Sequence, residues 1–278
     1  MIVTGAVSEV RSIRNRDRSA QWGFVPTMGY LHEGHLSLVR QARKENEAVA
    51  VSIFVNPRQF GPEEDLDTYP RDFERDIRML AEQQVDLVFT PDMETMYPQG
   101  FQTYVSVEQM SRVLEGRSRP SHFQGVTTVV AKLFNIVRPT KSYFGQKDAQ
   151  QCVVIKQMVK DLDFELEIVI CPIVREQDGL AMSSRNVRLS LEDRAAAPII
   201  YNSLIETSKR FRAGERNGDK LRQVMHDMLA TEARARIDYV SVADPASLEE
   251  LSIVERGALL STAVYFGSIR LIDNMHLE

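Results

Sequence analysis

Short apolar segments alternate with amphipathic helical patterns in the first third of the chain. The segments Trp22–Val25, Val49–Val55 and Asp86–Phe89 are each followed within two residues by proline, as expected where strands end. Between them, two segments place apolar side chains at helical spacing: one from Leu31 or Gly34 to Glu45, and one over residues 72–83. This alternation predicts an α/β fold with a Rossmann-like, doubly wound parallel sheet, which binds ligands at the carboxyl ends of its strands.

The pattern continues less regularly and then changes character after Arg185. A length of 278 residues favours about two domains, and we place the boundary near Val174–Met182. We therefore expect a Rossmann-like domain of residues 1–176 and a smaller α+β domain of residues 177–278. The further elements we expect are helices at 125–137, 148–160, 191–212 and 220–234, and strands at 104–107, 142–144, 164–170, 173–174, 237–242 and 258–266.

Charge and hydropathy exclude several classes of protein. The net charge is −5 and neither half of the chain is basic, so extended binding of nucleic acid is disfavoured. The longest nearly apolar run, Ala48–Val55, is far shorter than the ~20 residues that cross a bilayer, so no membrane partner is expected. The first twenty residues lack a secretory signal, which favours a cytoplasmic location. Cys152 and Cys171 are expected to be buried, reduced thiols.

The segment PTMGYLHEGH, Pro26–His35, follows the first predicted strand and enters a helix. His32 and His35 share a helix face, and Gly34 leaves room for a ligand to approach the backbone. A helix start binds phosphate readily because its N–H groups have no partner within the helix. Zinc is disfavoured because the zinc-binding HExxH pattern needs one more residue between the histidines. Taken alone, the motif is equally consistent with two solvated histidines.

Three further motifs narrow the interpretation of the PTMGYLHEGH segment. They are FVNPRQF at 54–60, FGQKDAQQ at 144–151 and DGLAMSSRN at 178–186. The histidine-glycine-histidine signature resembles the adenylyl-transferring superfamily that includes class I aminoacyl-tRNA synthetases. Within it, the four motifs in this order resemble the pantothenate synthetase family, and YPR at 69–71 and RLIDN at 270–274 extend the similarity.

The resemblance implies an ATP-dependent ligase that condenses (R)-pantoate with β-alanine. Pantoate carboxylate would attack the α-phosphorus of ATP and release pyrophosphate, and β-alanine would then displace AMP from the pantoyl adenylate. The resemblance also implies Mg²⁺ with the ATP, a homodimer formed through the first domain, ATP and pantoate binding by residues 1–176, and a lid formed by residues 177–278. Two alternatives are a related nucleotidyl transferase with another acceptor and a nucleotide-binding scaffold without catalysis.

The predicted site follows from these motifs. His32, His35, Lys147 and Arg185 are the predicted catalytic residues, with His35 as the proton donor of the first step by family similarity. Gln59, Gln151 and Asn56 are the predicted contacts for pantoate and β-alanine, since a glutamine amide can serve both a carboxylate and a hydroxyl. The predicted ATP contacts are Met28, Gly29, Tyr30, Leu31, His32, Glu33, Gly34, His35, Gly145, Gln146, Lys147, Asp148, Val174, Met182, Ser183, Ser184 and Arg185.

Several positions have no single assignment from the sequence. The metal ligands are unknown, although Asp76 and Asp148 are possible partners of Mg²⁺. The family usually has glutamate where this chain has Gln146, and leucine is commoner than Met182. His122 is equally consistent with a substrate contact and a helix cap. His226 and His276 are not expected in the site.

Overall fold

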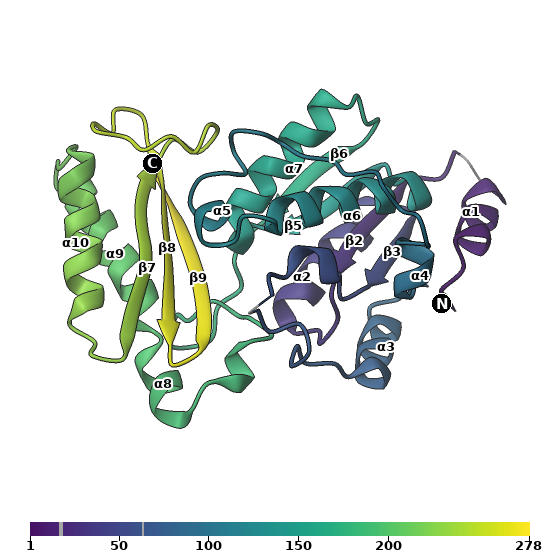
Figure 1. Ribbon diagram of the computed structural model, residues 1–278, viewed down its shortest axis with the longest axis horizontal. Coiled ribbons are helices and arrows are strands. Elements are labelled where there is room, and N and C mark those ends of the chain that lie inside the picture. The colour runs from purple at the N-terminus through teal and green to yellow at the C-terminus, as the bar shows by residue number, and fades with distance from the viewer. Residues whose placement is uncertain (17–18, 63) are drawn as a thin grey trace. The chain divides into compact units, whose positions relative to one another are not determined.

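The computed structural model describes residues 1–16, 19–62 and 64–278 (Figure 1). They form two compact units, each described here by itself. The first comprises Met1–Gly145 and Val154–Pro172, and the second comprises Gln146–Val153 and Ile173–Glu278. The functional division into residues 1–176 and 177–278 stays a prediction.

The first unit contains a parallel sheet in the order β1-β4-β3-β2-β5-β6. The chain reverses its direction of progress across the sheet between β2 and β5, which is the switch point of a doubly wound fold. The predicted fold class is therefore confirmed. The strands are β1 (Ile2–Thr4), β2 (Trp22–Thr27), β3 (Ala48–Ile53), β4 (Leu87–Phe89), β5 (Lys141–Gly145) and β6 (Glu167–Cys171).

Helices cover both faces of this sheet because its strands are apolar on both faces. Val25 of β2 joins a buried cluster with Val39 and Leu80, which lie on α2 (Glu33–Glu45) and α3 (Phe73–Glu82). Its neighbour Phe24 points to the opposite face and packs edge to face on Phe134 of α6 (His122–Val137). The other helices are α1 (Val7–Arg16), α4 (Met93–Met96), α5 (Glu115–Ser118), the 3₁₀ turn η1 (Pro57–Gln59), and α7 (Ala149–Asp161), which contributes to both units.

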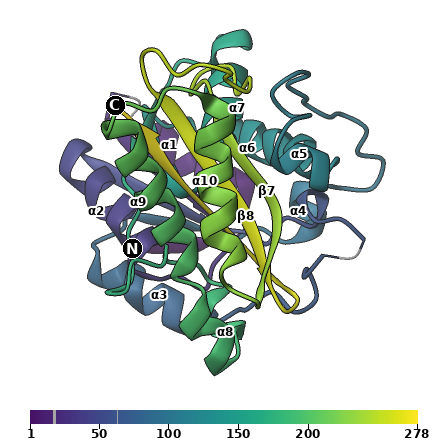
Figure 2. The same ribbon diagram turned by 90° about the vertical axis from the view of Figure 1, so that its left-hand side faces the viewer.

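The second unit has a three-stranded antiparallel sheet in the order β7-β8-β9. Figure 2 shows α9 and α10 side by side over one face of this sheet. Leu204, Met225 and Leu260 belong to the buried cluster between the helices and the strands. The elements are η2 (Gln146–Asp148), η3 (Asn186–Arg188), α8 (Leu191–Ala196), α9 (Ile199–Arg212), α10 (Gly218–Ala230), β7 (Ala235–Ala243), β8 (Ala258–Phe266) and β9 (Ile269–Leu277).

Two predicted strands are wrong, and each has a structural reason. The backbone of Val105 bonds to side chains of α6: its carbonyl accepts from Thr127 Oγ1 at 2.7 Å, and its N–H donates to Thr128 Oγ1 at 3.0 Å. The segment 104–107 therefore has no strand partner. Residues 173–174 belong to a turn in which the Val174 carbonyl accepts from Met182 N at 3.0 Å.

Other elements differ in extent or were missed. The predicted helix 191–212 is two helices, because Pro198 has no N–H to continue the first one. The strands β1 and β9 and the helix α1 were not predicted. In β9, Asp273 is buried where alternation leads one to expect an apolar residue, and Asn274 is buried on the opposite face of the strand. Among the described helices, none has the length and apolar character to span a bilayer.

Gly125 makes a close backbone contact that the fold requires. A Cβ atom there would lie 2.2 Å from the Arg58 carbonyl oxygen and 2.6 Å from Gln59 N. We predict that Gly125→Ala forces α6 away from η1 and lowers the free energy of unfolding by about 1–3 kcal/mol, the scale of overpacking. Urea unfolding would measure this. Gly145→Ala is the control, since its Cβ would meet nothing within 4 Å; equal stability of the two variants would contradict the prediction.

Candidate active site

The first motif forms a tight turn between β2 and α2. Gly29 and Tyr30 both have positive φ, at 82° and 50°, so two successive residues adopt the left-handed conformation. The Gly29 N–H donates to Thr27 Oγ1 at 3.2 Å, and Leu31 is buried. Because β2 lies beside the switch point of the sheet, this turn occupies the edge where doubly wound folds bind ligands.

His32 and His35 cap α2 reciprocally. His32 Nδ1 accepts from Gly34 N at 3.2 Å, and His35 Nδ1 accepts from His32 N at 3.3 Å. The rings lie 4.1 Å apart between centroids. Since both Nδ1 atoms act as acceptors, each neutral ring carries its proton on Nε2. The helix start therefore holds two imidazole donors in one tautomer, which suits an anionic phosphate. The Glu33 side chain forms an ion pair with Arg40 on the surface.

A hydrogen-bonded chain fixes the Gln59 amide. The Tyr97 hydroxyl donates to Asn56 Oδ1 at 2.7 Å, and burial raises the pKa of this hydroxyl, which keeps it a donor. Asn56 Nδ2 then donates to Gln59 Oε1 and to the Gly125 carbonyl, both at 3.1 Å. Gln59 Nε2 lies 3.2 Å from Met28 Sδ. The predicted substrate residues Asn56, Gln59 and Met28 are thus together. Asn56 is only 1% exposed, and its observed contacts orient Gln59; its contact with substrate stays a prediction.

His122 contacts the backbone of the same glutamine. Its side chain does not cap α6, where Ser121 is the cap residue. Instead, Nδ1 lies 2.9 Å from the Gln59 carbonyl, and Nε2 lies 3.3 Å from an Arg119 nitrogen that can only donate. The ring is therefore neutral with its proton on Nδ1. Burial, reinforced by the Arg119 charge, lowers the pKa of His122 from 6.5 to about 4. Arg119 is itself held by Glu64 at 2.5 Å.

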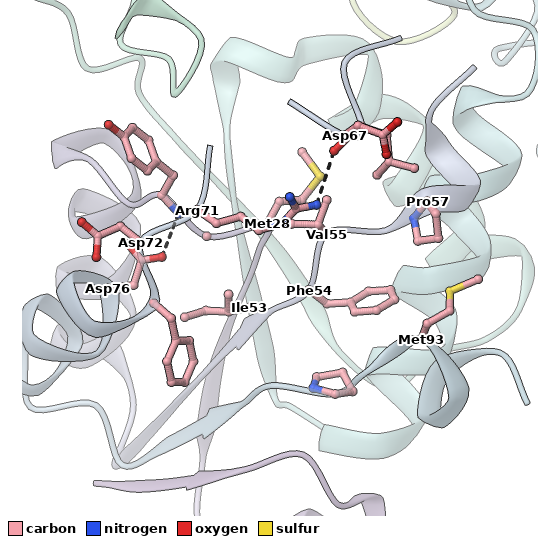
Figure 3. Close-up of a pocket in the computed structure, with 15 residues that line it drawn as sticks. Met28, Ile53, Phe54, Val55, Pro57, Asp67, Arg71, Asp72, Asp76 and Met93 are labelled. Atoms are coloured by element: carbon pink, nitrogen blue, oxygen red, sulfur yellow. Dashed lines mark hydrogen bonds between the residues drawn. The ribbon is translucent and has the colours of Figure 1, made fainter. Parts of the chain in front are cut away.

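A largely apolar cavity of about 550 Å³ lies on one side of the 28–30 turn (Figure 3). Met28, Gly29 and Tyr30 line it, as does Phe54 from the FVNPRQF motif. Arg71 and Phe54, which both line the cavity, were not predicted as site residues, although the YPR and FVNPRQF motifs contain them. Other lining residues not assigned to the site include Leu66, Asp72 and Phe73.

In the second unit, Asn274 braces the segment that contains Lys147. Asn274 is 3% exposed, and its Nδ2 donates to the carbonyls of Gln146 and Lys147, both at 2.9 Å. Gln146 Nε2 donates to Asn274 Oδ1 at 3.1 Å and lies 3.0 Å from His276 Nε2. The RLIDN motif therefore contributes a positioning residue that was not predicted. His276, which was not expected in the site, contacts a predicted site residue.

The other predicted site residues of the FGQKDAQQ motif are Gly145, Lys147, Asp148 and Gln151. Lys147 Nζ is 3.9 Å from Asp148 Oδ1, and the Asp148 side chain is 46% exposed. Gln151 lies in the first turn of α7 and is partly buried. In the first unit, Gly145 ends β5, and its surroundings leave open space where a side chain would be.

The MSSR segment follows a hairpin that is held by a partly buried ion pair. Arg175 contacts Asp273 through two hydrogen bonds of 2.5 and 3.0 Å and stacks on Tyr201 at 4.0 Å. Arg175 and Ala181 form a bridge, next to the hydrogen bond between Val174 and Met182. After this bridge, Ser183 Oγ accepts from Arg185 N at 3.3 Å and Ser184 is buried. Arg175 and Asp273 thus fix the start of Met182–Arg185.

Clusters of metal-binding side chains and the two cysteine thiols are the other groups to consider in the part of the chain that the structure describes. It contains no group of three or more His, Cys, Asp or Glu side chains arranged to hold a metal ion. Cys152 and Cys171 are buried and form no disulfide, and burial raises the pKa of Cys171 to about 11.

Comparisons with known proteins now decide the family. The family model for pantoate-beta-alanine ligase matches residues 2–276. The chain belongs to the pantoate–β-alanine ligase family. A pantothenate synthetase of Chloroflexus aurantiacus is 63% identical over 257 residues, 92% of each chain. The crystal structure of pantothenate synthetase from Thermus thermophilus has a TM-score of 0.95 at 47% identity and 99% coverage of both chains.

A further solved structure is of pantoate-beta-alanine ligase from Francisella tularensis, complexed with beta-gamma ATP and beta-alanine. It has a TM-score of 0.80 at 37% identity and covers 99% of this chain and 97% of that one. The family predicted from the four motifs is therefore confirmed, and with it the enzyme class, a ligase. The roles of individual residues stay predictions.

The buried neutral His122 predicts a pH dependence of stability. Between pH 6.5 and about 4, the unfolded chain binds a proton that the folded protein excludes, so the free energy of unfolding falls as the pH falls. The loss should reach roughly 3 kcal/mol across the window. Urea unfolding at several pH values would show it, and His122→Asn, which keeps a donor near Nδ1, should flatten the profile. His226→Asn, at an exposed histidine, should not; a wild-type slope in His122→Asn would contradict this account.

Proposed function

We propose that this ligase condenses (R)-pantoate with β-alanine to form pantothenate, through a pantoyl-adenylate intermediate, with release of AMP and pyrophosphate. The match to the ligase family over nearly the whole chain supports the reaction. The observation that carries the mechanism is the pair His32 and His35, each with its ring proton on Nε2, at a helix start beside the switch point of the sheet. These are fixed donors of the kind that an ATP phosphate needs.

In the first step, a pantoate carboxylate oxygen attacks the α-phosphorus, and the bond to the β-phosphate oxygen breaks to release pyrophosphate. Negative charge accumulates on phosphoryl oxygens, so fixed positive groups and N–H donors lower the barrier. In this proposal His35 is the proton donor and His32 a second donor. Lys147 supplies a compact charge and Arg185 a planar pair of donors. Ser183, Ser184 and the Met28–Gly34 turn contribute to ATP binding.

Pantoate recognition is assigned to Gln59 and Gln151. Because Asn56 occupies Oε1 of Gln59, the side chain presents its Nε2 donor, which suits a carboxylate or hydroxyl oxygen. In the second step, the β-alanine amine attacks the acyl carbon of the adenylate and AMP leaves. In this proposal Gln59 also lies near this amine, a role that family similarity supports.

Mg²⁺ is proposed as the companion of ATP, and it would neutralise phosphate charge. Asp148 fits this ion, because its side chain is 46% exposed and offers carboxylate oxygens, the ligands that Mg²⁺ prefers. Asp76 does not fit, because it is buried and both its oxygens already accept backbone hydrogen bonds. No step of the mechanism depends on either assignment.

The wider setting is also a proposal. Family similarity supports a homodimer formed through residues 1–176, and a lid role for residues 177–278. Two buried cysteines that form no disulfide are consistent with a reducing compartment, the cytoplasm. The proposed partners are the small molecules ATP, pantoate and β-alanine and a second copy of the chain, with no nucleic acid and no membrane.

ATP–pyrophosphate exchange tests this function directly. We predict exchange that depends on (R)-pantoate and does not need β-alanine, followed by AMP and pantothenate in equal amounts once β-alanine is added. Added tRNA should leave ATP consumption unchanged. A folded protein that shows no pantoate-dependent exchange would contradict the proposed function.

Single substitutions should separate the assigned roles. His35→Ala and Lys147→Ala should each slow adenylate formation by about 10²-fold or more, the scale for losing one transition-state donor. Gln151→Ala should raise the KM for pantoate and leave ATP binding nearly unchanged. His226→Ala, on the exposed side of α10, is the control. An equal loss of ATP and pantoate binding in Gln151→Ala would show that its role is assigned wrongly.

A further inference from the structure

Asp76 is hydrogen-bonded to the turn that precedes the two histidines. It lies on α3 and is 1% exposed. Its Oδ2 accepts from Tyr30 N and its Oδ1 from Leu31 N, both at 2.7 Å, and Figure 3 shows the first of these bonds. Both carboxylate oxygens therefore hold successive N–H groups of one turn, at the short distances typical of charge-assisted hydrogen bonds.

These two hydrogen bonds stabilise a turn whose backbone is strained. Tyr30 has a φ of 50°, a conformation that costs an L-residue roughly 1–2 kcal/mol. The neighbouring Arg75, on the same helix, also contacts this turn. Its Nη1 donates to the Leu31 carbonyl at 2.9 Å, and its guanidinium lies 5.5 Å from the Tyr30 ring centroid. We call the side chains of Arg75 and Asp76 the α3 clasp.

The hydrogen bonds of the α3 clasp extend to Leu31, one residue before His32. His32 and His35 keep their Nδ1 atoms occupied only while the backbone N–H groups of Gly34 and His32 stay in place. If Tyr30 relaxes to negative φ, the direction in which the chain enters α2 changes and this capping is lost. Burial raises the pKa of Asp76, so the carboxylate is kept there against a desolvation cost, which the two backbone bonds and the adjacent Arg75 partly offset.

We propose that Asp76, assisted by Arg75, is a positioning residue that fixes the ring orientation and tautomer of His32 and His35 for phosphate binding. This inference rests on the proposed function for the use of the histidines, but the geometry it asserts stands independently. It assigns Asp76 a role other than that of a Mg²⁺ ligand. The two roles predict different behaviour on substitution.

Asp76→Asn is the main test, because it keeps the shape and places an NH₂ group against a backbone N–H. We expect pantoate-dependent exchange to lose roughly 10- to 100-fold in kcat, the scale of a small misplacement of catalytic groups. The KM for pantoate and the Mg²⁺ concentration at half-maximal rate should change little. Glu74→Gln, on the exposed side of the same helix, should match wild type.

Imidazole ¹⁵N NMR gives a readout that does not depend on activity. Wild-type His32 and His35 should show the Nε2–H tautomer, and Asp76→Asn should lose this preference. If wild type shows the tautomer but no exchange, the proposed function fails and the clasp stands. An unchanged tautomer and kcat in Asp76→Asn would overturn the clasp. So would a defect that excess Mg²⁺ restores.

Arg75→Gln is a second test, which can be used if Asp76→Asn does not fold. It removes the bond to the Leu31 carbonyl and the contact with Tyr30 without placing an unpaired group in the interior. We expect a smaller loss of kcat, roughly 3- to 10-fold, with a mixed tautomer population at His32. Wild-type kcat and tautomer in this variant would overturn the proposed contribution of Arg75.

Discussion

The parallel pairing of β2 with β3 on one side and β5 on the other determines where this chain can do chemistry. Each strand of the pairing ends at the same edge of the sheet, and the chain order reverses between β2 and β5. A turn that leaves β2 at this point cannot be covered by a crossover helix on both sides. The PTMGYLHEGH turn therefore lies at the ligand-binding edge of the sheet, and the sequence places two histidines there.

Buried polar side chains, more than apolar packing, give the site its shape. Asn56 and Asp76 in the first unit, and Asn274 in the second, are each at most 3% exposed and bond to backbone groups of the site motifs. A buried polar group costs free energy unless its hydrogen bonds are made, so each loop has one conformation in which these partners are satisfied. The groups in contact with substrate can then be few, because others hold them in place.

The sequence is informative about elements whose pattern is local. The strand 258–266 has the bounds predicted, and the helices 31–45 and 72–83 differ from α2 and α3 by one or two residues. Predictions fail where a distant partner decides the outcome. The 104–107 segment has strand-like residues, but Thr127 and Thr128 of α6 satisfy its backbone.

The candidate site divides in the same way. Its motifs lie in continuous stretches of chain, so His32, His35, Gln59 and Lys147 can be found from sequence. The residues that hold them, Asp76, His122 and Asn274, are far away in the chain and belong to no periodic pattern that marks them. His122 shows the limit clearly, since neither sequence interpretation considered a bond to the Gln59 carbonyl.

Gln146 is chemically matched to its neighbours, although family similarity leads one to expect glutamate there. The two carbonyls that accept from Asn274 Nδ2 fix the orientation of that amide, so its Oδ1 faces Gln146. His276 Nε2 faces the same nitrogen of Gln146. A glutamate at this position would meet Asn274 Oδ1 without a proton to share, and would need His276 to donate instead. Glutamine satisfies both acceptors as a neutral donor, so position 146 and the β9 residues Asn274 and His276 have to match one another, and the placement of Lys147 depends on that match.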